Sequence, residues 1–198
     1  CEKAVLSANG MRGQVLWWGA GDDDGMGAAL LELCGGGLGN VHVDTAQMAR
    51  EALEASPWAH VVIAATNANG GSRRSAALEL DVLAGCLDLM KAMLLLPAGS
   101  RPCMWLVTRG AQGPGAATSV HAGLWGMARS VRAEKGEELR CVSVDVDPTL
   151  AGVVAAARLH AEMSRGEGDS DEVALRGKLD RHVAQLERVS AALASAAG

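Results

Sequence analysis

Short apolar runs alternate with longer stretches of helical periodicity along most of the chain. The runs are rich in valine, leucine and other apolar residues, as buried strands are, and each is followed by glycine or a polar residue. Between the runs, apolar residues recur three and four positions apart, which predicts amphipathic helices. The strands are expected at 15–18, 41–43, 61–65, 103–108 and 139–146, and the helices at 26–33, 44–55, 76–96, 120–133 and 150–163.

Regular alternation of strand and helix predicts a parallel sheet with helices on both faces. The expected fold class is therefore α/β, a doubly wound, Rossmann-like sheet. Residues 172–176 and 182–186 are expected to add a last pair of strands, joined through Gly177. The predicted organisation is a lead-in at 1–13, the Rossmann-like domain at 14–188 and an Ala/Ser-rich tail or linker at 189–198.

The longest helical pattern, 76–96, has leucines and a methionine at helical spacing. Residues three and four apart lie on one face of a helix, so one face of this helix is predicted to be apolar. The predicted face consists of Leu80, Leu83, Leu87, Met90 and Leu94.

A glycine-rich loop, 19–27 (GAGDDDGMG), follows the first predicted strand. The dinucleotide-binding fingerprint G-x-G-x-x-G requires glycine where Asp24 stands, and Asp22 and Asp23 would repel a pyrophosphate. We therefore expect no working cofactor site and favour a solvated acidic turn that caps the first helix. Asp44, after the second strand, is placed for a ribose hydroxyl but suits a helix cap equally well, as does Thr45 beside it.

The aromatic composition limits the chemistry, because the 198 residues include five Trp but no Tyr and no Phe. The tyrosine–lysine pair of short-chain reductases is therefore absent. His121 could replace the missing acid, although a surface or interface histidine is the simpler interpretation. Arg109 follows the fourth strand, at the sheet edge where such folds bind ligands, and is expected to form a structural salt bridge.

Charge and cysteine usage narrow the partners and the compartment. The net charge of −5 argues against a nucleic-acid binder. Five scattered cysteines without a CxxC pair predict a reducing compartment and no metal site. No apolar run approaches the length of a membrane span and no signal peptide precedes the domain, so we expect a cytoplasmic protein. The chain begins at Cys1 rather than Met, which favours a domain of a longer protein.

Four segments resemble the structural, non-catalytic subdomain of the ketoreductase in modular type I polyketide synthases. The two central ones are specific, and the order and spacing of all four fit that family over about 14–188. The segments are 104–111 (MWLVTRGA), 124–129 (LWGMAR), 141–145 (CVSVD) and 172–177 (EVALRG).

The resemblance implies a truncated short-chain-reductase-like fold without cofactor or catalytic residues of its own. The implied partner is the catalytic ketoreductase subdomain, which carries NADPH and reduces β-ketoacyl thioesters on the acyl carrier protein. Other synthase domains are further implied partners, among which the resemblance allows an enoylreductase. The alternative is a free-standing Rossmann-like enzyme or nucleotide-binding protein with an atypical acidic loop.

The resemblance also places the catalytic subdomain against helix 120–133, where small residues allow a close approach. The alternative is that Trp125 is buried in this domain's own core. The residues expected at the interface are His121, Leu124, Trp125, Ala128 and Arg129.

Overall fold

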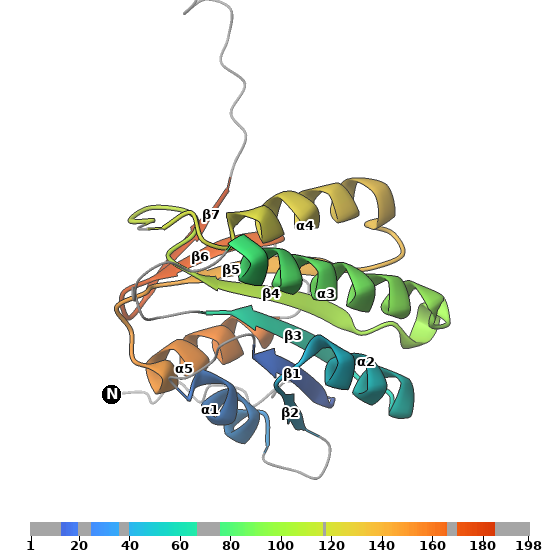
Figure 1. Cartoon of the computed structure of the whole chain (residues 1–198). Coiled ribbons are helices and arrows are strands. Elements are labelled where there is room, and N and C mark those ends of the chain that lie inside the picture. The colour runs from blue at the N-terminus through green and yellow to red at the C-terminus, as the bar shows by residue number, and fades with distance from the viewer. Residues whose placement is uncertain are drawn as a thin grey trace, which may run out of the picture.

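One seven-stranded sheet forms the centre of the molecule (Figure 1). The computed structural model describes residues 13–19, 25–35, 40–66, 76–116, 118–165 and 170–184. The strand order is β2-β1-β3-β4-β5-β6-β7, and every neighbouring pair is parallel except the last, β6 with β7. The strands are β1 (Val15–Gly19), β2 (Val41–Val43), β3 (His60–Ala65), β4 (Cys103–Arg109), β5 (Cys141–Val146), β6 (Glu172–Arg176) and β7 (Asp180–Val183).

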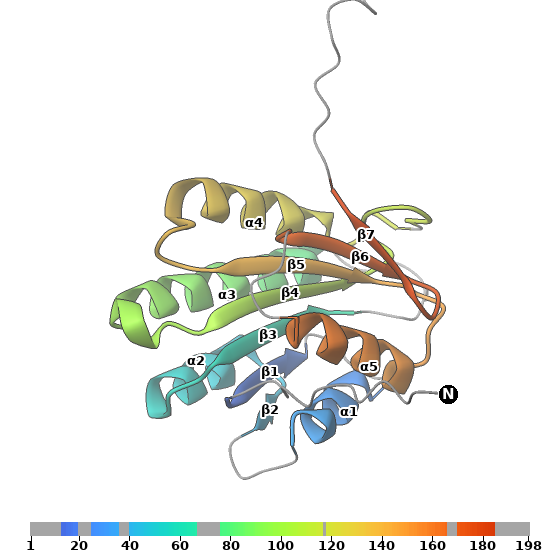
Figure 2. The same ribbon diagram turned by 180° about the vertical axis from the view of Figure 1, so that it is seen from behind.

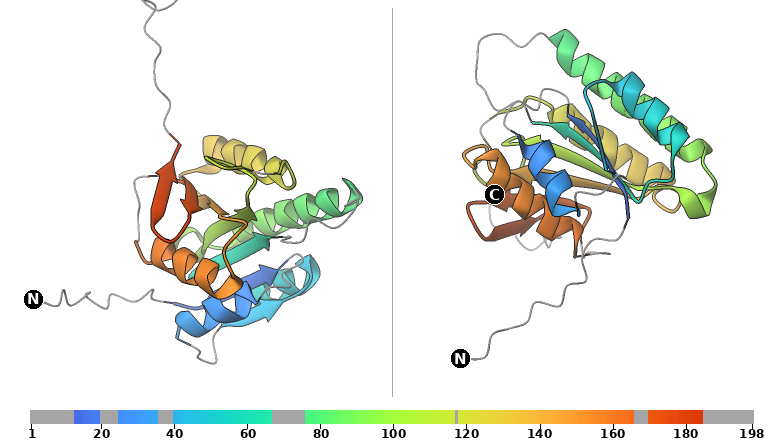
Figure 3. Two further views of the ribbon diagram at one scale, coloured as in Figure 1. Left: turned by 90° about the vertical axis from the view of Figure 1, so that its left-hand side faces the viewer. Right: turned by 90° about the horizontal axis from the view of Figure 1, so that it is seen from below.

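Helices cover both faces of the sheet (Figures 1 and 2). Helices α2, α3 and α4 pack on one face and α1 and α5 on the other, and the view from below shows the sheet between the two layers (Figure 3). The expected doubly wound, Rossmann-like fold is therefore confirmed. The helices are α1 (Met26–Leu33), α2 (Ala46–Ala55), α3 (Ala76–Leu95), α4 (Ala122–Lys135) and α5 (Gly152–Met163), with a short 3-10 turn at Ala98–Ser100.

Strand β1 shows how the sheet separates its two cores. Successive side chains of a strand point to opposite faces, so Leu16 and Trp18 pack toward α2 and α3, whereas Val15 and Trp17 pack toward α1 and α5. All four are buried. A strand buried on both faces has no polar face, which is why its sequence reads as a continuous apolar run.

The apolar face predicted on α3 is not the side of the helix that this domain buries. Leu80 and Leu87 are 63% and 42% exposed, and the buried residues are Val82, Cys86, Leu89, Met90 and Met93. The side of the helix that carries Gly85 is turned inward, because a Cβ at Gly85 would lie 2.6 Å from Ala46 Cβ and 2.8 Å from Trp18 Cη2. Both stripes of α3 are apolar, so periodicity alone could not choose between them.

The ends of several elements follow the predicted signals. The Thr45 hydroxyl accepts a hydrogen bond from the Met48 N–H and caps α2, and Asp44 does not serve as the cap. Helix α1 ends at Leu33, with Cys34 as its C-cap and Gly35 next at φ 104°, as the Cys-Gly-Gly-Gly stretch predicts. The last strand was misplaced, since β7 begins at Asp180; the turn after β6 takes three residues and pairing resumes directly, with Arg176 opposite Asp180.

The strand order reverses at β1: the chain passes from β1 to β2 on one side and then returns to place β3 on the other side of β1. In open α/β sheets ligands bind at the carboxyl edge of such a switch point. The acidic residues Asp22, Asp23 and Asp24 fall outside the described residues, so the prediction about them stays a prediction. Helix α1 begins after Gly25, whose φ of 76° is left-handed.

Candidate functional site

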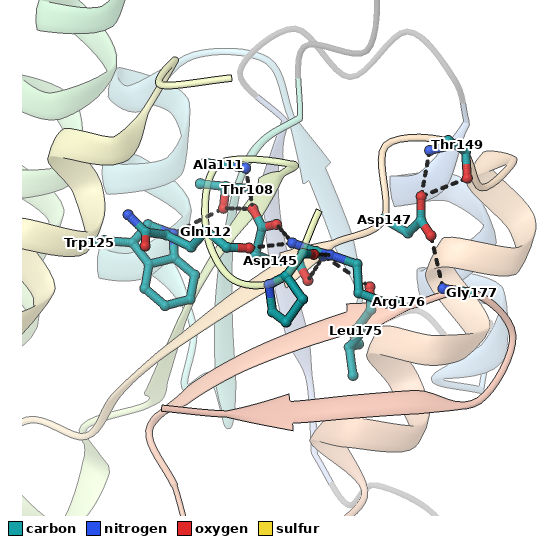
Figure 4. Close-up of polar contacts among 11 residues, drawn as sticks. Thr108, Ala111, Gln112, Trp125, Asp145, Asp147, Thr149, Leu175, Arg176 and Gly177 are labelled. Atoms are coloured by element: carbon teal, nitrogen blue, oxygen red, sulfur yellow. Dashed lines mark hydrogen bonds and ion pairs between the residues drawn. The ribbon is translucent and has the colours of Figure 1, made fainter. Parts of the chain in front are cut away.

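Polar side chains gather where β4, β5 and β6 end (Figure 4). The carboxyl ends of parallel strands meet at one edge of the sheet, and here they bring together Thr108, Asp145 and Arg176. Asp145 has no exposed surface. Its Oδ1 accepts hydrogen bonds from Thr108 Oγ1 at 2.5 Å and from the Ala111 N–H at 2.8 Å.

The Arg176 guanidinium compensates the buried Asp145 carboxylate. Its Nη2 lies 2.6 Å from Asp145 Oδ2, and its Nη1 donates to the Asp145 and Leu175 carbonyls at 3.1 Å each. The same guanidinium donates to the carbonyls of Gln112 and of Pro114 in the β4–α4 loop, the latter at 2.6 Å. Arg176 therefore fastens that loop over the ends of β5 and β6, at the carboxyl edge of the sheet but away from the switch point between β1 and β3.

A second carboxylate ties the same edge to the β6–β7 turn. Asp147 Oδ1 accepts from the Thr149 N–H and hydroxyl at 2.8 and 2.6 Å, and Oδ2 accepts from the Gly177 N–H at 2.8 Å. The Thr149 hydroxyl is the largest of the influences that lower the pKa of Asp147 below its usual 3.8, followed by the Gly177 and Thr149 N–H groups. Both carboxylates at this edge are thus engaged in bonds within the domain.

Trp125 extends the network into α4. Its indole Nε1 donates to Thr108 Oγ1 at 3.0 Å, and the residue is 3% exposed. One turn later, Arg129 pairs with Glu172 of β6 through two bonds of 2.7 and 2.8 Å, and Arg132 pairs with the same carboxylate. The hydrogen bond from Arg129 is the main influence that lowers the pKa of Glu172 below its usual 4.5.

Four of the five residues expected at an interface lie inside this domain. His121, Leu124, Trp125 and Ala128 are buried, and Arg129, which is 55% exposed, is paired with Glu172. The contacts of Trp125 are those of the core alternative. His121 precedes α4 in the left-handed region, with φ 62°, and Arg109 is buried at the end of β4. An acid role for His121 and a salt bridge for Arg109 stay predictions.

Sequence reasoning missed the two residues at the centre of the network. Asp145 and Arg176 were noticed only as parts of longer motifs, in CVSVD and EVALRG. The available signal was a charged residue at or near the end of each apolar strand. A buried charge is costly unless it is paired with an opposite charge. Once β5 and β6 are known to be neighbours in the sheet, an ion pair between Asp145 and Arg176 is the expected result.

A shallow groove lies between the first turns of α3 and α4. It is lined by Glu79, Leu80, Leu83, His121, Gly123 and Leu124. Across the described part of the chain, no three His, Cys, Asp or Glu side chains are grouped so that they could hold a metal ion. Among the described helices, none is both long and apolar enough to cross a membrane.

The family model of the Rossmann fold domain of the polyketide synthase extender module SpnB matches residues 14–186. The chain belongs to this family. The match covers most of the chain and confirms the resemblance to the ketoreductase region of polyketide synthases that the sequence motifs predict. The search of curated proteins found no match to this chain.

Solved structures show the same fold. The SpnB-type domain superposes on an A-type ketoreductase of a modular polyketide synthase with a TM-score of 0.58 at 24% identity, over 83% of this chain and 36% of that chain. A C2-type ketoreductase gives a TM-score of 0.58 at 23% identity, over 85% and 39%. A structure containing adenylation, ketoreductase and pseudo Asub domains of a keto acid-selecting NRPS module gives 0.68 at 12% identity, over 87% and 16%. This chain thus spans little more than a third of the A-type and C2-type ketoreductase chains and 16% of the NRPS chain.

Proposed function

We propose that this domain is the non-catalytic, structural subdomain of a polyketide synthase ketoreductase. It packs on the NADPH-dependent catalytic subdomain, which reduces β-ketoacyl thioesters on the acyl carrier protein, and stabilises it. The observation that carries the proposal is a set of leucines on α3 and small residues on α4 that this domain leaves largely exposed, on either side of a groove that Glu79 also lines.

Helix α3 supplies the apolar part of this face. Leu80, Leu83 and Leu87 follow each other at spacings of three and four, and Leu80 and Leu87 are exposed although α3 already buries its opposite side. A helix that is apolar on two sides is typical of one covered on both. The second side of α3 is therefore the surface that we assign to the catalytic subdomain.

Helix α4 supplies the small part of the face. Gly123, Gly126 and Ser130 are exposed and lie on one stripe, and a Cβ added at either glycine would meet no atom within 4 Å. The groove between Leu80 and Gly123 shows that the two helices border each other here. Small residues beside leucines allow another helix to approach closely. We name the residues Leu80, Leu83, Leu87, Gly123, Gly126 and Ser130 the α3/α4 face.

The polar edge of the sheet supports a structural role. Arg176 and the loop it holds occupy the ends of β5 and β6, and their donors and acceptors are engaged with each other. The sequence also lacks the tyrosine on which ketone reduction by short-chain reductases depends. NADPH is accordingly assigned to the catalytic subdomain and not to this domain, and a cytoplasmic synthase is the proposed setting.

Footprinting tests the docking. Hydroxyl-radical labelling is compared between the lone domain and the full polypeptide that carries the catalytic subdomain. The reporters are Leu80 and Leu87 of the α3/α4 face and Met127, which is half-buried next to Gly126 on α4. We expect the three side chains to be protected in the full polypeptide, and equal labelling would overturn the proposal. Val153 on α5, which is 67% exposed on the other side of the sheet, provides the unprotected reference.

Paired substitutions test the consequence. Leu80→Glu with Leu87→Glu places two charges on the α3/α4 face and should lower the temperature at which the full polypeptide loses ketoreductase activity. Val153→Glu, a matched exposed change, should leave it unaltered. Titration of NADPH into the lone domain should show no saturable binding, and tight binding would favour the nucleotide-binding alternative.

A further inference from the structure

Helix α4 is fastened to the sheet by relatively little apolar contact. Its buried residues are Leu124, Trp125 and Ala128, whereas α3 buries Val82, Cys86, Leu89, Met90 and Met93. Met127 and Val131 pack partly against the same core. Polar bonds provide further ties: Trp125 bonds to β4, and Arg129 and Arg132 bond to β6. Changes in these bonds are therefore expected to move α4 more readily than α3.

The bond from Trp125 is the first link of a buried chain across three strands. Trp125 Nε1 donates to Thr108 Oγ1, Thr108 donates to Asp145 Oδ1, and Asp145 Oδ2 pairs with Arg176 (Figure 4). An indole N–H can only donate, so the Thr108 oxygen must accept. Its single proton is then directed to the Asp145 carboxylate, which accepts. The donor and acceptor of each hydrogen bond in this series are thus determined by the indole N–H at one end and the carboxylate at the other.

We propose that Thr108 is a positioning residue for the α3/α4 face. Its hydroxyl links the first turns of α4 to the Asp145–Arg176 pair and sets where Gly123 and Gly126 stand relative to the leucines of α3. This inference rests on the proposed function, since it concerns the fit of the face to its partner. Thr108 has no exposed surface, so it acts through Trp125 and not by touching the partner.

Other groups cannot replace this link easily. Valine has nearly the shape of threonine but lacks the hydroxyl, so Thr108→Val leaves the Trp125 N–H without an acceptor. Asp145 Oδ1 loses one of its two hydrogen bonds and keeps the one from the Ala111 N–H. Serine retains the hydroxyl, so Thr108→Ser retains both bonds. Thr66 is a matched control: it is equally buried, at the end of β3, and its hydroxyl makes no hydrogen bond to the described residues.

Hydrogen exchange of the lone domain tests the positioning itself. In Thr108→Val, amides of α4 should exchange about fivefold to tenfold faster than in the wild type, which corresponds to the loss of one net hydrogen bond, while amides of α3 change less. Thr108→Ser should restore the wild-type rates, and Thr66→Val should not alter α4. An unchanged α4 in Thr108→Val, or equal acceleration throughout the domain, overturns the inference.

Footprinting of the full polypeptide then tests the link to docking. Thr108→Val should partly remove the protection of Met127, and Thr108→Ser and Thr66→Val should keep it. If Met127 stays fully protected in Thr108→Val, the inference is wrong although the proposed function stands. If Met127 is unprotected even in the wild type, the proposed function fails, whereas the exchange rates of the lone domain still decide whether Thr108 positions α4.

Discussion

Asp145 and Arg176 form a buried ion pair, with Arg176 Nη2 2.6 Å from Asp145 Oδ2, on neighbouring strands β5 and β6. Asp145 has no exposed surface and Arg176 only 9%. Removing one member of a buried pair leaves an uncompensated charge, which costs far more than an exposed pair contributes. This pair joins both strands and the β4–α4 loop, so the arrangement of these three segments depends on it.

Arg176→Met is therefore expected to lower the free energy of unfolding by about 3–5 kcal/mol. Arg129→Met removes one partner of Glu172 at a half-exposed site and should cost no more than about 1 kcal/mol. Chemical denaturation of the lone domain measures both changes. Equal losses in the two variants would contradict the assigned role of Arg176.

Gly85 and Gly126 should respond oppositely to alanine. A Cβ at Gly85 would overlap Ala46 and Trp18, so Gly85→Ala should destabilise the domain by about 1–3 kcal/mol. Gly126 stands in open space within α4, so Gly126→Ala should stabilise the lone domain by about 0.5–1 kcal/mol through helix propensity. Thermal unfolding distinguishes the two, and a loss of stability in Gly126→Ala would show that this surface is not open.

Trp125→Ala is expected to destabilise the lone domain by about 3–5 kcal/mol, as large core truncations do. Trp125→Phe keeps a ring but removes the indole N–H, and should cost less. Denaturation curves of the lone domain provide the measurement. A lone domain with wild-type stability after Trp125→Ala would instead support the interface assignment for this side chain.

His60 is expected to make stability fall in mild acid. The Trp105 indole N–H donates to His60 Nδ1 at 3.2 Å, which requires an unprotonated Nδ1. Burial, followed by the charge of Arg140, lowers the pKa of His60 below its usual 6.5. Between the lowered pKa and 6.5, the folded state therefore binds fewer protons at His60 than the unfolded state. The contribution of neutral His60 to the free energy of unfolding is complete above pH 6.5 and is lost as the pH falls below that value.

The test compares unfolding free energies of the wild type and His60→Leu between about pH 7 and about pH 5. The wild type should lose more stability than the variant over this interval. Parallel curves would show that His60 does not contribute to the slope.

Much of the architecture could be predicted from the order of residues along the chain. Apolar runs such as 61–65 are typical of strands that are buried on both faces. Because helical patterns lie between these runs, the expected fold is a parallel sheet covered by helices on both faces. Local signals also predicted the ends of two helices. The Thr45 hydroxyl accepts a hydrogen bond from the N–H three residues later and caps α2, and Gly35 adopts, just after α1, a positive φ that other residues avoid.

Tertiary structure decided what depends on residues far apart in sequence. Helix α3 carries two apolar stripes, and only its packing against Ala46 and Trp18 determined which one is buried and left Leu80 and Leu87 outside. Likewise, Asp145 and Arg176 are separated by a complete helix and meet only because β5 and β6 pair side by side. The periodicity of a segment determines which of its residues share a face. Which neighbour covers that face is determined by how the strands pair and how the helices pack on the assembled sheet.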